Sequence, residues 1–91
     1  IVTPEPGKLT FPINRQHLSG GAVITDEEVL KTIATLFKHL KLVVEPGGAV
    51  AVAAALTGQI PSGSKTVVAV ASGGNVDNTI FKRALSAGAF F

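Results

Sequence analysis

The chain has 91 residues, of which 46% are hydrophobic and 15% charged, with a formal net charge of +2. This composition excludes a disordered tail, and the scattered Lys and Arg residues form no patch typical of nucleic-acid binding. The chain has no Cys, its two His lack spaced partners for zinc, and no apolar run is long enough to cross a membrane. We therefore expect a cytoplasmic protein without a metal site and with neither a nucleic acid nor a membrane as partner.

Residues 1–20 predict an irregular arm, because Pro4, Pro6 and Pro12 interrupt regular structure. The apolar residues 22–24 then predict a short buried strand. Residues 21–91 are expected to form one α/β piece that follows this arm.

The strongest helix signal begins at Thr25. Glu28 follows three residues later, which is the spacing of a capping box, and acidic residues occupy the first turn, where the helix dipole favours them. Apolar residues recur at helical spacing after this cap. The pattern predicts a helix over residues 26–40.

Two further helices are indicated by their end signals. Pro46 suits the first turn of a helix over residues 46–57, and Gly58 is its stop signal. Asp77 can cap a last helix that runs to Ala87.

Residues 66–71 are β-branched or small and apolar, without alternation, which is the pattern of a parallel strand covered on both faces. The fold class expected is α/β, with about three helices and two to three strands in part of an open parallel sheet. Because two strands alone are marginal, we expect the sheet to continue outside these residues, upstream or in another subunit. The absence of Met likewise predicts that Ile1 is no native start.

Two Gly-rich bends carry the functional signal, residues 44–49 and 70–77. At the carboxyl end of the expected strand, Ser72 presents a hydroxyl beside several backbone N–H groups, and ligands bind at that edge of α/β sheets. By residue type alone, Ser72 caps a turn or contacts a ligand, and Glu45 caps a helix or faces the same site. Gly73 and Gly74 present N–H groups that suit a phosphate, although no P-loop Lys accompanies them.

Four segments in order resemble the threonine/serine dehydratase group of pyridoxal-phosphate enzymes, which includes serine racemases and hydroxyaspartate dehydratases. They are residues 3–12, 24–29, 41–49 and 67–77. The resemblance implies the C-terminal piece of the cofactor-binding domain, in the tryptophan-synthase-β-like (type II) fold. It also implies an enzyme of amino-acid metabolism, a lyase that eliminates water from a hydroxy-amino acid and deaminates it.

The resemblance further implies which residues bind pyridoxal 5'-phosphate. The Ser72 hydroxyl would contact the pyridine nitrogen, Glu45 would lie near the same ring edge, Gly73 and Gly74 would let the backbone approach, and Asn75 would hold the turn. The family's Schiff-base lysine, phosphate loop and metal-binding acidic residues lie upstream. No catalytic or metal-binding residue is therefore expected within this chain, which alone should be inactive.

Several alternatives remain open at this point. A serine racemase or hydroxyaspartate dehydratase would share the same cofactor edge, so the substrate is not fixed. A non-catalytic module of this ancestry would bind a partner or itself through its apolar faces. A small phosphate-binding domain is a third reading of the Gly-Gly bends. The partners expected are the remainder of the enzyme chain and further copies in a homo-oligomer.

Overall fold

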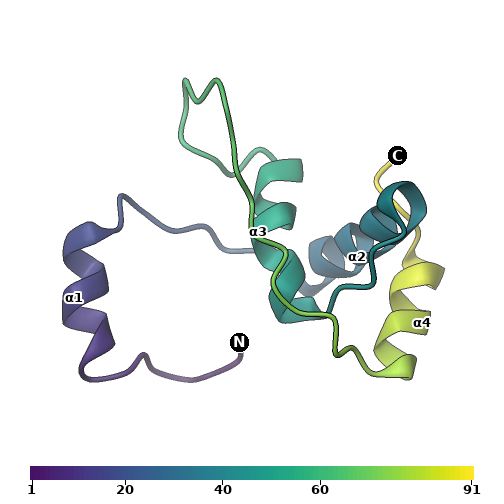
Figure 1. Ribbon diagram of the computed structural model, residues 1–91, viewed down its shortest axis with the longest axis horizontal. Coiled ribbons are helices and arrows are strands. Elements are labelled where there is room, and N and C mark those ends of the chain that lie inside the picture. The colour runs from purple at the N-terminus through teal and green to yellow at the C-terminus, as the bar shows by residue number, and fades with distance from the viewer.

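The computed structural model describes all residues 1–91, which form four α-helices and no β-strand. Helix α2 packs against both α3 and α4, while α1 packs against no other helix. Figure 1 shows α1 standing apart from the group formed by α2, α3 and α4. The helices are α1 (Thr10–His17), α2 (Asp26–Leu40), α3 (Pro46–Leu56) and α4 (Asn78–Ala87).

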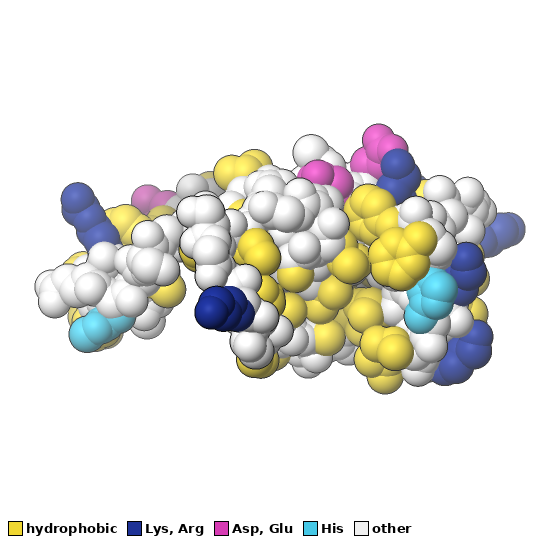
Figure 2. Space-filling view, turned by 90° about the horizontal axis from the view of Figure 1, so that it is seen from above, with side chains coloured by type: hydrophobic (Ala, Val, Ile, Leu, Met, Phe, Trp, Pro, Cys, Tyr) yellow, Lys and Arg dark blue, Asp and Glu magenta, His cyan; other side chains and the backbone are white.

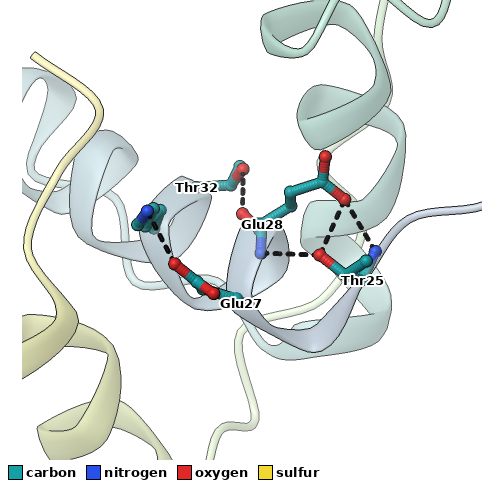
Figure 3. A network of polar contacts seen from close by, with 5 residues as sticks. Thr25, Glu27, Glu28 and Thr32 are labelled. Carbon is teal, nitrogen blue, oxygen red and sulfur yellow. Dashed lines mark hydrogen bonds and ion pairs between the residues drawn. The ribbon is translucent and has the colours of Figure 1, made fainter.

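Helix α2 starts at the predicted capping box (Figure 3). The Thr25 N–H and hydroxyl both donate to Glu28 Oε2 at 2.8 Å, and the Glu28 N–H donates to Thr25 Oγ1 at 3.3 Å. These bonds satisfy backbone groups that a helix start leaves without partners. The prediction of a helix over residues 26–40 is confirmed.

The core lies where the apolar face of α2 meets α3 and α4. Ile33 is its largest fully buried apolar side chain. Helices α3 and α4 present Ala49, Ala53 and Ala84, which are also fully buried and allow the helices to approach closely. Phe37 of α2 and Phe81 of α4 form a perpendicular ring pair with centroids 5.3 Å apart.

The expected α/β fold with an open parallel sheet was wrong, because the chain contains no strand. Residues 66–71 have no regular secondary structure and form no backbone hydrogen bond, and Val68 and Val70 are 88% and 68% exposed. Residues 22–24 are likewise unpaired, and Val23 is exposed. β-Branched residues favour an extended backbone, but a strand also needs a partner for its N–H and C=O groups. No segment of this chain supplies one.

The prediction of an irregular arm was wrong over Thr10–His17, which forms α1. Pro12 is the third residue of this helix, where the missing N–H would have had no partner within the helix. The first turn is closed by the Phe11 N–H, which donates to Gly7 O at 3.0 Å. Helix α1 has no buried residue, so the rest of the chain does not fix its position.

Candidate functional site

The candidate site forms where the start of α3 meets the turn at residues 72–75. The Glu45 N–H donates to the Gly73 carbonyl at 2.8 Å, which is the backbone hydrogen bond that joins the two segments. Glu45 occupies the N-cap position of α3, but its side chain makes no capping hydrogen bond. The carboxylate lies instead against the Gly73 backbone, where a Cβ would come within 2.7 Å of Glu45 Cδ.

Three glycines allow this close approach. A Cβ on Gly48 would lie 2.7 Å from Gly73 N and 2.8 Å from Gly73 O, and one on Gly74 would lie 2.8 Å from Val43 O. Side chains do not tolerate such distances to backbone atoms. The two segments can therefore touch only because Gly48, Gly73 and Gly74 lack side chains. In this structure Gly73 lies against Glu45, and Gly74 lies against the Val43 carbonyl.

Polar side chains gather in a cleft of about 550 Å³ beside this contact. It is lined by Glu45, Ser72, Asn75 and Asp77, with Ile1 at one side. Ser72 is exposed, and none of the side-chain hydrogen bonds of the chain involves its hydroxyl. The Asp77 carboxylate is already engaged, because its Oδ1 accepts from the N–H groups of Thr79 at 2.7 Å and Ile80 at 3.4 Å. The Ser72 hydroxyl and the Asn75 amide are therefore the side-chain donors of the cleft that no other group of the chain engages.

The ends of two helices border the cleft. Helix α3 begins at its N-cap Glu45, and α4 begins at its N-cap Asp77. The helix starts fix the backbone on both sides of the cleft, while the Ser72 turn lies between them. Glu45 and Asp77 are thus each attached to the start of a helix, whereas Ser72 belongs to an irregular segment.

The sequence analysis did not identify Gly48. This residue allows the two segments to touch because it has no side chain. A signal was present, because Gly47 and Gly48 occupy the first turn of a helix, where glycine is unfavourable. A glycine retained at such a cost indicates a close approach. Nothing in the sequence indicated that Ile1 lines the cleft, where its Cγ2 lies 3.4 Å from a Cβ position on Gly47.

The rest of the surface offers less chemistry. A second cleft of about 750 Å³ lies between residues 19–22 and 59–61, and no charged side chain lines it. No group of three His, Cys, Asp or Glu side chains is placed to hold a metal ion. No helix is both long and apolar enough to cross a membrane.

The groups that line the cleft at Ser72 are chemically suited to one edge of a nitrogen heterocycle. The cleft offers a hydroxyl donor and a carboxylate next to backbone that carries no side chains, and its volume lies within the range of about 300–1,000 Å³ typical of small-molecule sites. No Lys lines it. The cleft can therefore contact such a ring but offers no amine for covalent attachment.

Comparison with known proteins identifies the family of this chain. A family model described as "Pyridoxal-phosphate dependent enzyme" matches residues 1–73. The L-threonine ammonia-lyase of Geobacter sulfurreducens is 39% identical over 77 residues, which are 85% of this chain and 19% of that protein. The L-threonine ammonia-lyase of Thermotoga maritima is 33% identical over 88 residues, 97% of this chain and 22% of that protein.

A serine racemase of Dictyostelium discoideum is 30% identical over 82 residues, 88% of this chain and 25% of that protein. No solved structure matches significantly. The chain thus spans about a fifth to a quarter of the length of these relatives. The family match covers most of the chain and includes Glu45, Gly48 and Ser72. The chain belongs to the family of pyridoxal-phosphate dependent enzymes.

Proposed function

We propose that the intact protein is a threonine/serine dehydratase and that this chain supplies the edge of its cofactor site that faces the pyridine ring. The observation that carries the proposal is the shared cleft of Ser72 and Glu45, at a contact made possible by three glycines. The family match and the ammonia-lyase names of two relatives support the same reading.

Ser72 would hold the ring nitrogen through its hydroxyl. A hydroxyl is a neutral donor, so it leaves the ring nitrogen largely unprotonated, whereas a carboxylate partner would favour the protonated form. When bound, pyridoxal phosphate supplies the electron sink for reactions at the substrate Cα. Ser72 would thereby limit the strength of that sink, to a level that suffices for loss of a β-hydroxyl group.

Glu45 and Asn75 would shape the same edge. The Glu45 carboxylate lies against the Gly73 backbone and lines the cleft, so it would border the ring beside Ser72. Asn75 also lines the cleft and follows the glycines of the turn. Both side chains would orient the ring without taking part in bond breaking.

The proposed reaction removes water from a hydroxy-amino acid such as threonine or serine. The Cα proton and the β-hydroxyl leave as water, and hydrolysis of the resulting enamine gives a 2-oxo acid and ammonia. This chain offers no Lys in the cleft. The lysine that binds the cofactor and the loop that holds its phosphate would come from the rest of the intact enzyme, which is the first partner proposed. We also propose a homo-oligomer.

The test is Ser72→Ala in the intact enzyme. We expect the rate of 2-oxo acid formation from threonine to fall at least about tenfold, because the ring nitrogen loses its donor, while the circular dichroism spectrum stays unchanged. Ser86→Ala on the exposed face of α4 is the matched control and should keep full activity. Full activity in Ser72→Ala would refute the role assigned to Ser72.

Serine racemase activity is the second candidate, favoured by the Dictyostelium relative. Both reactions would use the same ring edge, so the cleft does not separate them. Incubation of the intact enzyme with L-serine distinguishes the two. Formation of pyruvate without D-serine supports the dehydratase, and D-serine as the main product supports the racemase.

A further inference from the structure

We propose that Gly48 is a positioning residue of this site, which sets the Ser72 turn against the start of α3. The inference rests on the function proposed for Ser72, but it concerns a residue that does not line the cleft. Gly48 would act only through the backbone of Gly73, the next residue after Ser72 in the chain.

The Gly73 peptide is held from two directions. Its carbonyl accepts the hydrogen bond from Glu45 N–H at 2.8 Å. A Cβ on Gly48 would lie 2.7 Å from the Gly73 nitrogen, 2.8 Å from its oxygen and 3.0 Å from Val44 Cγ1. Gly48 is itself buried, so a methyl group at this position has no open space to occupy. The backbone of one segment or the other would have to move.

Such a movement would reach Ser72. Restoring ordinary contact distances to a methyl group requires a shift of roughly 1 Å, because non-bonded carbon atoms settle near 3.5–4.0 Å. Hydrogen bonds from a hydroxyl have donor–acceptor distances of about 2.5–3.0 Å, so a shift of this size is enough to lose one. The absence of a side chain at residue 48 would therefore keep the Ser72 hydroxyl within hydrogen-bonding reach of a bound ring.

Gly47 provides a matched control for the backbone effect. It lies in the same helical turn, so Gly47→Ala and Gly48→Ala change helix propensity alike. A Cβ on Gly47 would meet only Ile1 Cγ2, at the ordinary distance of 3.4 Å. For ligand affinity the control is Gly21→Ala, because a Cβ there meets no atom within 4 Å.

The experiment compares these variants in the intact enzyme by two readouts. Hydrogen exchange with mass spectrometry measures protection of residues 43–49 and 70–77, and absorption titration with pyridoxal phosphate measures affinity. We expect Gly48→Ala to exchange at least about tenfold faster in both segments and to bind the cofactor at least about tenfold more weakly. Gly47→Ala should keep the exchange of the wild type, and Gly21→Ala its affinity.

Exchange in Gly48→Ala that equals that of Gly47→Ala would overturn the contact. Faster exchange with unchanged affinity would make Gly48 a structural residue only and would also overturn the proposal. A wild-type enzyme that binds no pyridoxal phosphate would refute the proposed function, while the exchange comparison would still test the contact.

If Gly48→Ala does not fold, a measurement on the wild-type enzyme still tests the proposal. If Gly48 couples the two segments, pyridoxal phosphate should protect residues 48–56 of α3, none of which lines the cleft, together with residues 70–77. Protection confined to the lining residues 45–47 and to residues 70–77 would overturn the coupling and with it the positioning role.

Discussion

Glu28 shows how a single residue makes stability depend on pH. The backbone hydrogen bond from Thr25, followed by the one from its hydroxyl, lowers the pKa of the Glu28 carboxyl below its ordinary value of 4.5. A carboxyl with a lower pKa in the folded state stabilises that state above its unfolded pKa. This contribution is lost as the pH falls through the folded pKa. The start of α2 should therefore loosen in acid.

We expect Glu28→Gln to weaken this dependence. The Gln side-chain oxygen can still accept from the Thr25 N–H but does not titrate, so the cap would survive acidification. The measurement is the free energy of urea unfolding between about pH 3 and about pH 6, around the ordinary carboxyl range. Glu27→Gln, which removes an exposed ion pair with Lys31 at 2.8 Å, should change the slope less. Equal pH slopes in Glu28→Gln and wild type would contradict the assignment.

Gly73 and Glu45 should behave as a coupled pair. A Cβ on Gly73 would meet Glu45 Cδ at 2.7 Å, Cγ at 3.2 Å and the carboxylate oxygen Oε1. We expect Gly73→Ala to cost about 1–3 kcal/mol of unfolding free energy, which is typical of overpacking. Glu45→Ala removes all three atoms. In that background, Gly73→Ala should cost at least about 1 kcal/mol less.

The double-mutant cycle has its control in Gly74. A Cβ there would meet Val43 O at 2.8 Å, which Glu45→Ala leaves in place. Gly74→Ala should therefore add to Glu45→Ala without coupling. Additive effects of Glu45→Ala and Gly73→Ala would show that the carboxylate does not lie against Gly73.

At the level of elements, capping residues and an N-terminal proline predicted three of the four helices, α2, α3 and α4. Thr25, Pro46 and Asp77 mark the starts of α2, α3 and α4, and Gly88, with a φ of +80°, follows the end of α4. These signals act within one helical turn, so they can be recognised without knowing the fold. Helix α1 was not predicted, because the three prolines of the arm indicated irregular structure. The hydrogen bond from Phe11 N–H to Gly7 O that closes its first turn leaves no recognisable signal in the sequence.

The two strand predictions were wrong because a strand depends on a distant partner, and signals within a short segment do not show whether that partner exists. Residues 66–71 have strand composition, yet the partner that would make them a strand is absent from the chain. The structure places two of the candidate residues, Glu45 and Ser72, in one cleft, but the sequence did not predict the contact that brings them together. Ser72 and Glu45 could be named from motifs, whereas the contact of Gly48 with Gly73 depends on two segments crossing, which no motif records.

Helix α3 should tolerate large side chains on one face only. Ala53 is fully buried between helices, while Ala51 is exposed. We expect Ala53→Leu to lower the free energy of unfolding by about 1–3 kcal/mol, because the added carbons have no room. Ala51→Leu should change it by less than about 0.5 kcal/mol. Urea denaturation checks both, and equal costs would show that α3 does not pack by this face.

At the scale of the whole molecule, the shape is more open than a compact domain. The radius of gyration is 14.1 Å, against about 12 Å for a compact domain of this length. Only 11 of 91 residues are buried, so most apolar side chains remain outside the core. Figure 2 shows hydrophobic side chains gathered on the face that it draws. Exposed apolar surface of this kind favours association.

Val68 and Val70 should contribute strongly to that association. They lie two residues apart in a segment without regular secondary structure, and both are well exposed, at 88% and 68%. We expect residues 1–91 alone to bind a hydrophobic dye and to self-associate with rising concentration in sedimentation velocity. Burial of two valines stabilises an interface by about 3 kcal/mol or more.

The double substitution Val68→Ser with Val70→Ser should therefore weaken self-association at least about tenfold, since about 1.4 kcal/mol corresponds to that factor. The control is Val2→Ser, because Val2 is 97% exposed but belongs to the N-terminal arm and not to residues 66–71. Its effect should be smaller than that of the double variant. A chain that stays monomeric up to its solubility limit, without dye binding, would show that the exposed valines do not drive association.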